Sequence, residues 1–398
     1  MQISKRLQEM EVSPVRKFTP YADEARAKGK KIYGLNIGQP DIKTPKTFFE
    51  AIKNFDTEVV AYVNSRGDDR LIAAVQRYYK RLGLEFEKNE IVITEGGSEA
   101  LMFLMLSILN EGDEVLMAEP FYANYKTFYG LAGGKLVGIP TTAEEGYQYA
   151  DRERIEKCIT DKTKAFVVVN PNNPTGKVLS HDEMKLIVDI CLEHDLYLVC
   201  DEVYREFVYD GKEMSTFGQF KEAEQNIIII DSVSKRFSAC GARIGTVCSK
   251  NKEVMAEMLK LCQGRLSASM IEQVGCAELY DMDPSYFDEI KAEYEHRRNV
   301  TIEALNEIEG IKYGVPEGAF YMTCHLPVDD AEKLLLFLLK DFDIDGETVM
   351  YAPARGFHVT PGAGYSDIRI AYVLNADDMK KAINILKEGI KAYNALNK

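Results

Sequence analysis

The segment Asp231–Gly245, DSVSKRFSACGARIG, follows the run Ile227–Ile230 of four isoleucines. A short, wholly apolar run is typical of a strand that is buried on both faces of a parallel sheet. Lys235 therefore lies just beyond the carboxyl end of a strand, with Ser232 before it and Arg243 after it. There its amine could form a Schiff base with an aldehyde whose phosphate the serine and the arginine bind. Lysines at strand ends are more often only solvated, so the hypothesis depends on the rest of the chain.

Short apolar strands and amphipathic helices alternate along the chain around this segment. From about residue 90, stretches such as IVIT, EVLMA, AFVVV and LYLVC alternate with longer helical stretches. This alternation predicts an α/β fold, a three-layer αβα domain with a mostly parallel sheet. After about residue 284, a long charged helix and several short strands predict a smaller α+β domain. We expect a large domain at 46–283, a small domain at 284–398, and an N-terminal segment, 1–45, packed on the small domain.

Length and charge narrow the class of protein. A chain of 398 residues is long enough for two domains. Its 49 basic and 63 acidic residues give a net charge of −14, which disfavours binding to nucleic acid or to an anionic membrane surface. The eight cysteines are scattered singly, and the N-terminal stretch lacks an apolar signal segment. We therefore expect a soluble cytoplasmic protein with reduced thiols and no metal site.

Two further motifs lie at predicted carboxyl ends of strands, where open α/β sheets bind ligands. ITEGGSEAL places Gly97 and Ser98 at the start of a helix, where backbone N–H groups bind an anion. An ordinary helix cap at Ser98 would explain this motif equally well. VVVNPNNPTGKV places Asn173 in a proline-rich turn after an apolar strand. Turn chemistry alone accounts for that composition, but a rigidly held Asn173 is also a fixed donor toward a ring oxygen.

The remaining motif, LVCDEVYREF, places Asp201 at the end of a strand that should be buried on both faces. A carboxylate there is costly unless a cation pairs with it. A protonated pyridine nitrogen would be such a cation and would let the ring withdraw electrons from a substrate carbanion. Tyr204, three residues on, could donate to the ring's phenolate oxygen. One cofactor, pyridoxal 5′-phosphate, carries the phosphate, ring nitrogen, ring oxygen and aldehyde that all four motifs would bind.

These motifs together carry a family resemblance. SxSKxFxxxGxRIG, NPNNPTG, DEVY, GGSEAL and the near-terminal GYSDIRIAY resemble the fold-type I pyridoxal-phosphate aminotransferases of the aspartate aminotransferase superfamily. The resemblance extends from GLNIGQPDIKTP, near residue 34, to the last helix.

The resemblance implies a role for each matching residue. Lys235 matches the Schiff-base lysine that also moves the substrate proton, and Asp201 matches the partner of the ring nitrogen. Tyr204 and Asn173 match the contacts to the ring oxygen. The phosphate would be held by Ser232, Arg243, Gly97 and Ser98, and by Tyr62 across a dimer interface. Tyr122 matches the aromatic residue that stacks on the ring. Arg369 matches the clamp on the substrate α-carboxylate, with Gly38 in the neighbouring substrate loop.

The substrate is the least determined part of the prediction. A second carboxylate on aspartate or glutamate needs a cation, and the candidates are Arg265, Arg66 and Arg355. Arg265 is preferred because it lies where relatives bring a substrate-binding residue from the partner subunit. We thus expect a homodimeric aminotransferase that moves an amino group from aspartate or glutamate to a 2-oxo acid by a ping-pong mechanism.

Three alternatives remain open. The same cofactor chemistry could serve a carbon–sulfur β-lyase, or an aminotransferase for aromatic or other neutral amino acids. A non-catalytic binding protein that only retains the fold is disfavoured, because Lys235, Asp201 and Arg369 are all present.

Overall fold

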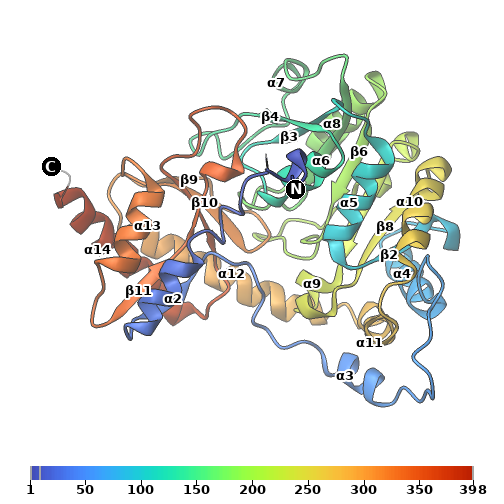
Figure 1. Cartoon of the computed structure of the whole chain (residues 1–398), viewed down its shortest axis with the longest axis horizontal. Helices are drawn as coiled ribbons and strands as arrows, with labels where there is room; N and C mark the ends of the chain where they lie inside the picture. Colours follow the sequence, from blue (N-terminus) through green and yellow to red (C-terminus); the bar gives the residue numbers. More distant parts are fainter. Residues whose placement is uncertain (1, 9, 397–398) are drawn as a thin grey trace.

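A seven-stranded sheet forms the centre of the larger part of the molecule (Figure 1). The structure is a computed structural model that describes residues 2–8 and 10–396. The strand order is β2-β8-β7-β6-β5-β3-β4, and all neighbouring pairs are parallel except those that include β8. The strands are β2 (Ile91–Thr94), β3 (Glu114–Ala118), β4 (Lys135–Ile139), β5 (Thr163–Val169), β6 (Tyr197–Asp201), β7 (Ile227–Ser232) and β8 (Gly245–Ser249).

Helices cover both faces of this sheet, because its strands are apolar on both sides. Ile228 and Ile230 belong to one buried cluster, while Ile227 and Ile229 belong to the other. The first cluster includes helices α5 (Gly96–Ile108), α6 (Asn124–Leu131) and α10 (Lys252–Arg265). The second includes α3 (Lys46–Lys53), α4 (Asp69–Arg81), α7 (Arg152–Glu156), α8 (His181–Glu193) and α11 (Met270–Tyr280). The predicted α/β class with three layers is therefore confirmed.

The C-terminal part of the chain forms a second, smaller module. Its four-stranded antiparallel sheet has the order β12-β13-β10-β9. The strands are β9 (Lys312–Tyr313), β10 (Tyr321–His325), β12 (Ala352–Pro353) and β13 (Asp367–Ala371). The helices are α12 (Tyr286–Leu305), α13 (Ala331–Lys340) and α14 (Ala376–Leu396).

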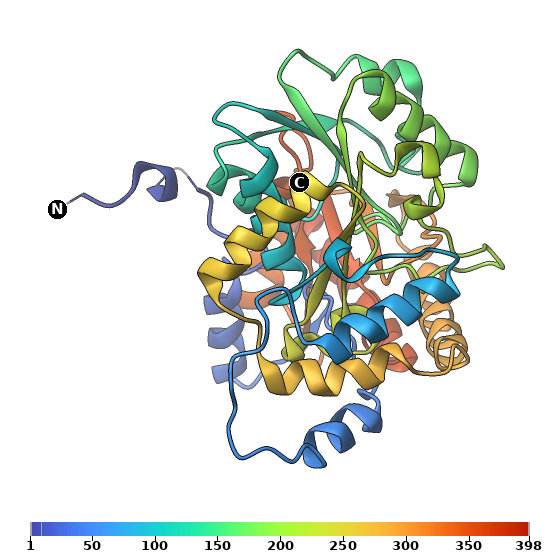
Figure 2. The ribbon, with the colours of Figure 1, turned by 90° about the vertical axis from the view of Figure 1, so that its right-hand side faces the viewer.

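Residues near the N-terminus lie against this second module. Strand β1 (Lys31–Gly34) pairs in parallel with β11 (Glu347–Met350), and α2 (Thr19–Ala27) contacts α13. Helix α1 (Lys5–Gln8) projects away from the rest of the molecule (Figure 2). The predicted domain limits at residues 45 and 283 stay predictions.

Short helical turns and local caps set where several elements begin. Ser180 caps α8 and forms a capping box with Glu183, and the Asp68 carboxylate caps α4. The remaining short elements are η1 (Lys88–Glu90), η2 (Phe217–Gln219), η3 (Lys221–Ala223), α9 (Val233–Arg236), η4 (Cys240–Ala242) and η5 (Arg355–Phe357). Within residues 2–8 and 10–396, no helix has the length and apolar character that crossing a membrane requires.

Candidate active site

A cavity of about 550 Å³ opens at the carboxyl ends of strands β5, β6 and β7. It brings together all but two of the predicted site residues from segments far apart in the sequence. Those that line it are Gly38, Gly97, Ser98, Tyr122, Asn173, Asp201, Tyr204, Ser232, Lys235, Arg243 and Arg369.

Lys235 enters the cavity from the short helix α9, directly after β7. Ser232 caps this helix, because its hydroxyl accepts a hydrogen bond from the N–H of Ser234 at 3.1 Å. The Lys235 Nζ donates to the carbonyl oxygen of Gly38 at 2.9 Å. A side chain at position 38 would collide with Tyr321, since a Cβ there would lie 1.7 Å from the Tyr321 hydroxyl oxygen. Glycine is therefore what allows this carbonyl to approach the lysine.

The start of helix α5 and Arg243 form the side of the cavity predicted to bind phosphate. Helix α5 begins at Gly96, so Gly97 and Ser98 lie in its first turn, where backbone N–H groups have no partner within the helix. The capping residue is Glu95, so the alternative that Ser98 is the N-cap is wrong. Arg243 adopts a left-handed backbone (φ 54°), and its guanidinium donates to the carbonyl oxygen of Cys240 at 2.9 Å. A Cβ at Gly96 would lie 2.3 Å from this guanidinium, so glycine lets Arg243 lie against the helix start.

Asp201 is a buried carboxylate with no cation beside it. It is the last residue of β6 and is 8% exposed. Its Oδ2 accepts a hydrogen bond from the Tyr125 hydroxyl at 2.6 Å, and its Oδ1 accepts one from the N–H of Val203 at 3.3 Å. No described residue forms an ion pair with it, and burial raises the pKa of its carboxyl to about 6. A cationic ring nitrogen is the kind of partner this carboxylate lacks.

Arg369 carries the opposite charge to Asp201. It is a buried cation, and no described residue beside it is an anion. It lies on β13, is 3% exposed, and its guanidinium donates to the carbonyl oxygen of Asn36 at 2.6 Å and to Oδ1 of Asn173 at 3.2 Å. Its Nε has no hydrogen-bond partner within the described residues. A buried guanidinium that lines a cavity and has no anionic partner within the described residues fits a carboxylate ligand.

Hydroxyl and amide groups connect these two charged ends of the cavity. The Asn173 side-chain amide donates to the Tyr204 hydroxyl at 3.5 Å, and the Tyr204 hydroxyl donates to the Tyr321 hydroxyl at 3.1 Å. Burial raises the pKa of Tyr204 well above its usual range, so its hydroxyl remains a donor. The Tyr122 hydroxyl accepts from the Asn124 side-chain amide at 2.7 Å, and Asn124 is the first residue of helix α6.

Tyr62 and Arg265 lie outside the cavity of their own chain. Tyr62 is 80% exposed, while Arg265 forms an ion pair with Glu99 at 2.7 Å. Of the other predicted candidates, Arg66 donates to the carbonyl oxygen of Asn89 at 2.8 Å, and Arg355 lies over the ring of Tyr365. The roles expected of Tyr62 and Arg265 at a partner's site stay predictions.

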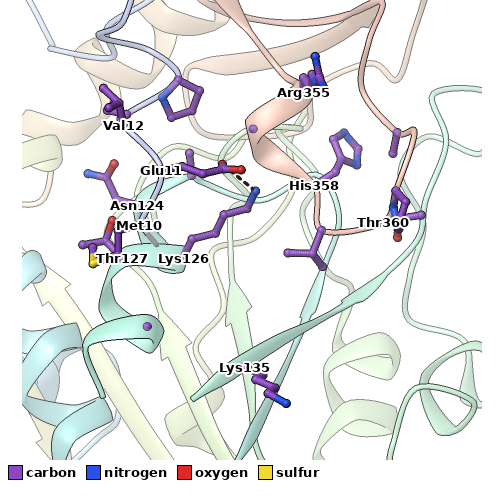
Figure 3. A pocket seen from close by; sticks show the side chains of 18 of the residues that line it. Met10, Glu11, Val12, Asn124, Lys126, Thr127, Lys135, Arg355, His358 and Thr360 are labelled. Atoms are coloured by element: carbon purple, nitrogen blue, oxygen red, sulfur yellow. Dashed lines mark ion pairs between the residues drawn. The ribbon is translucent and has the colours of Figure 1, made fainter. Parts of the chain in front are cut away.

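A second, larger cavity of about 1140 Å³ shares the lining residues Ser13 and Asn124 with the first (Figure 3). It is bordered by residues 10–14, helix α6 and the loop 355–365. Lys126 forms an ion pair with Glu11 at 3.7 Å within it. The motif residues line the smaller cavity, so the chemistry is expected there rather than in the larger space.

Two cavity residues were missed by the sequence analysis. Arg16 lies between the N-terminus and α2, lines the smaller cavity and forms no ion pair within the described residues. No motif surrounds it, so no sequence signal distinguishes it from other exposed arginines. Tyr321 also lines this cavity, and the only local signal near it is the glycine of EGAFYM, three residues earlier, which indicates a turn before a strand.

Comparison with known proteins identifies the family of this chain. The model of the family described as "Aminotransferase class I and II" matches residues 30–386. The aspartate aminotransferase of Bacillus subtilis (strain 168) is 30% identical, with 99% of this chain and 100% of the relative covered. The aspartate aminotransferase of Bacillus sp. (strain YM-2) is 32% identical, with 98% and 99% covered.

Solved structures match over nearly the whole chain. Aspartate aminotransferase from Thermus thermophilus with maleate has a TM-score of 0.88 at 29% identity, covering 98% of this chain and 100% of its own. Alanine aminotransferase from Pyrococcus furiosus has a TM-score of 0.90 at 28% identity, with the same coverage. Enzymes of this class use pyridoxal 5′-phosphate. The ring nitrogen of this cofactor fits the unpaired carboxylate of Asp201, and the carboxylate of an amino-acid substrate fits the unpaired guanidinium of Arg369. This chain belongs to the class I and II aminotransferases.

Proposed function

We propose that the amino donor of this aminotransferase is aspartate or glutamate, and that a 2-oxo acid accepts the amino group in the second half of a ping-pong reaction. The observation that carries the proposal concerns the arginines of the cavity other than Arg243, which is assigned to the phosphate. The buried Arg369 and the exposed Arg16 both line the cavity, and neither forms an ion pair within the described residues. A dicarboxylic amino acid has one carboxylate for each.

Different residues around the cavity would bind different groups of the cofactor. When bound, pyridoxal phosphate supplies an aldehyde that reacts with amines and a ring that withdraws electrons from the substrate α-carbon. Asp201 would hold a proton on the ring nitrogen. Asn173 and Tyr204 would donate hydrogen bonds to the ring oxygen. Ser232, Arg243 and the first turn of α5, with Gly97 and Ser98, would bind the phosphate, while Tyr122 would lie against the ring.

Lys235 would be the proton carrier of the reaction. Its Nζ lies 2.9 Å from the Gly38 carbonyl oxygen, which holds the amine inside the cavity. Once free of the cofactor, this amine would remove the proton from the substrate α-carbon and return it on the cofactor side. Arg369 would bind the α-carboxylate and so fix the α-carbon next to Lys235.

The relatives support the dicarboxylic preference. Those named above from Bacillus are aspartate aminotransferases, and the Thermus thermophilus enzyme was solved with maleate, a dicarboxylate. The Pyrococcus furiosus relative is an alanine aminotransferase of similar fold, so the fold alone does not decide the donor. The second cation at the cavity, Arg16, is what supports a dicarboxylic donor.

The test is the pair of variants Arg16→Leu and Arg265→Leu, assayed with aspartate and with alanine. We expect Arg16→Leu to lower kcat/KM for aspartate about a hundredfold, since a charge-assisted hydrogen bond contributes about 1.5–3 kcal/mol, and to leave alanine unaffected. Arg265→Leu should leave both unchanged. If Arg265→Leu alone lowers the rate with aspartate, the cation comes from the partner subunit instead.

The same preparation separates the alternative activities. Release of pyruvate and ammonia from cystathionine without an added 2-oxo acid would identify a carbon–sulfur β-lyase. Faster conversion of phenylalanine or alanine than of aspartate would identify an aminotransferase for neutral amino acids. For an aspartate aminotransferase, the full reaction requires the 2-oxo acid.

We also propose that the enzyme is a cytoplasmic homodimer. The exposed segment around Tyr62 carries Val59 at 68% and Val60 at 63% exposure, and an apolar stretch of this kind favours an interface. A second copy placed there would bring Tyr62 to the partner's phosphate. All eight cysteines are free thiols, which fits a reducing compartment.

A further inference from the structure

Tyr321, the first residue of β10, connects the lysine side of the cavity with the tyrosine side. Its hydroxyl accepts a hydrogen bond from the Tyr204 hydroxyl at 3.1 Å and donates to the Gly38 carbonyl oxygen at 3.3 Å. The same carbonyl oxygen accepts the hydrogen bond from the Lys235 Nζ at 2.9 Å. A hydrogen-bonded chain therefore runs from Lys235 through the Gly38 carbonyl and the Tyr321 hydroxyl to Tyr204.

Neighbouring groups hold the Tyr321 ring in place on several sides. The side chain is 2% exposed. The guanidinium of Arg369 lies 4.7 Å from the ring centre, and the Tyr204 ring packs edge-on at 5.6 Å. The hydroxyl occupies the space that a Cβ of residue 38 would need. The orientation of the hydroxyl is thus determined by packing, and its loss would not be replaced by another side chain.

We propose that Tyr321 is a positioning residue for transamination, whose hydroxyl sets the strength of the hydrogen bond that Tyr204 donates to the cofactor ring oxygen. The inference rests on the proposed role of Tyr204. Nothing in the family motifs quoted above includes Tyr321.

Hydrogen-bond chemistry gives the mechanism. A tyrosine hydroxyl has one proton and can rotate it between acceptors. With a ring oxygen present, Tyr204 gives its proton to that oxygen, and its own oxygen becomes free to accept from Tyr321. A hydrogen bond received by Tyr204 strengthens the one it donates, because bonds in a chain polarise one another. The Gly38 carbonyl oxygen also accepts a hydrogen bond from Tyr321, and it accepts one from Lys235 as well. Whether Lys235 occupies this carbonyl therefore influences the hydrogen bond that Tyr204 donates to the ring oxygen.

The test uses the holoenzyme of Tyr321→Phe, which keeps the ring beneath Arg369 and removes only the hydroxyl. The first readout is the pH at which the visible absorbance band of the bound cofactor is half converted. We expect this midpoint to rise by about half a pH unit or more, because a weaker hydrogen bond from Tyr204 stabilises the deprotonated ring oxygen less. The second readout is the half-reaction with aspartate, in which kcat should fall about tenfold while KM stays close to that of the unaltered enzyme.

Tyr147→Phe is the matched control. Tyr147 is also buried, and its hydroxyl donates to the carbonyl oxygen of Thr323, a residue of β10, at 3.0 Å. This variant removes a buried phenol hydroxyl that contacts β10, and Tyr147 does not line the cavity, so the variant should shift neither the midpoint nor kcat. Tyr204→Phe provides the maximum shift for comparison.

The outcomes separate this inference from the proposed function. If Tyr321→Phe has the midpoint and kcat of the unaltered enzyme while Tyr204→Phe shifts both, the positioning role of Tyr321 is wrong and the role of Tyr204 stands. If Tyr204→Phe shifts neither, the proposed contact to the ring oxygen fails, and the inference fails with it. A rise in KM with no midpoint shift would mean that Tyr321 acts only on the substrate arginine, which also overturns the inference.

Discussion

Two neighbouring regions of this molecule contain buried charges. In one region the charges form ion pairs with one another, and in the other they do not. One region is the ion cluster of Glu202, Arg205, Glu206, Asp231 and Arg236, in which each arginine bridges two carboxylates. Arg205 pairs with Glu202 at 2.6 Å and with Asp231 at 3.2 Å, and Arg236 pairs with Asp231 at 2.6 Å and with Glu206 at 3.0 Å. The other region is the cavity, where Asp201 and Arg369 are also buried but form no ion pair within the described residues.

The two regions alternate residue by residue along the same segments. Arg236 directly follows Lys235, and Arg205 directly follows Tyr204, yet each arginine belongs to the cluster while its neighbour lines the cavity. The ion pairs of the cluster therefore fix the segments around residues 204 and 235 on the side away from the cavity. Since an unpaired buried charge is costly, the charges left unpaired at the cavity indicate where ligands supply the missing charge.

The largest effect is expected inside the ion cluster. Arg236→Met leaves Asp231 and Glu206 without a shared cation, so the free energy of unfolding should fall by about 3–5 kcal/mol. Urea unfolding without cofactor measures it. Lys157→Met, which breaks the exposed ion pair with Glu153, is the control and should change little. An Arg236→Met protein as stable as the unaltered chain would remove the distinction between the two regions.

For Arg369, the buried arginine of the cavity, we expect a loss of activity without a loss of stability. Arg369→Leu removes a cation with no ion pair, so it should leave the stability of the cofactor-free protein unchanged or higher. Its kcat/KM should fall about a hundredfold or more, roughly 3 kcal/mol, because the α-carboxylate loses its partner.

Arg298→Leu is the matched control for that variant. Arg298 is similarly buried, but it forms an ion pair with Asp210. This variant should lose stability and keep its activity. Finding that both arginine variants lose stability equally would show that Arg369 is held by the protein alone.

The smallest effect is expected at the proposed subunit interface. Tyr62→Phe removes one hydroxyl from the partner's phosphate site, so the Kd for pyridoxal phosphate should rise about tenfold. An absorbance titration measures the Kd, and analytical ultracentrifugation should show that the variant remains a dimer. An unaltered protein that sediments as a monomer would contradict both the interface and the role of Tyr62.

Much of the fold and the centre of the site could be predicted from local sequence. The isoleucine run before Asp231 predicts a strand buried on both faces, and its residues do divide between the two cores. Polar residues at strand ends, such as Asp201 and Lys235, meet at one cavity because parallel strands share an edge.

Contacts between distant segments could not be predicted in the same way. Arg16 and Tyr321 reach the cavity from the N-terminal segment and from β10, and nothing near them in the sequence gives their partners. Arg265 pairs with Glu99, 166 residues earlier in the chain, and nothing near Arg265 in the sequence indicates this partner. Which charges are neutralised depends on such long-range pairs.

The most direct test of the account is the stability of Asp201→Asn against that of the unaltered protein, without cofactor, from pH 4 to 8. The Asp201 pKa of about 6 in the folded protein lies above the ordinary value of 3.8, so its ionisation weakens folding as pH rises between these values. The variant lacks this penalty. It should match the unaltered protein near pH 4 and exceed it by about 2–3 kcal/mol above pH 6. Pyridoxal phosphate should then stabilise the unaltered protein more than the variant. An Asn variant that is less stable at pH 7.5 without cofactor, and equally stabilised by it, would contradict the claim that Asp201 is buried for a cationic ligand.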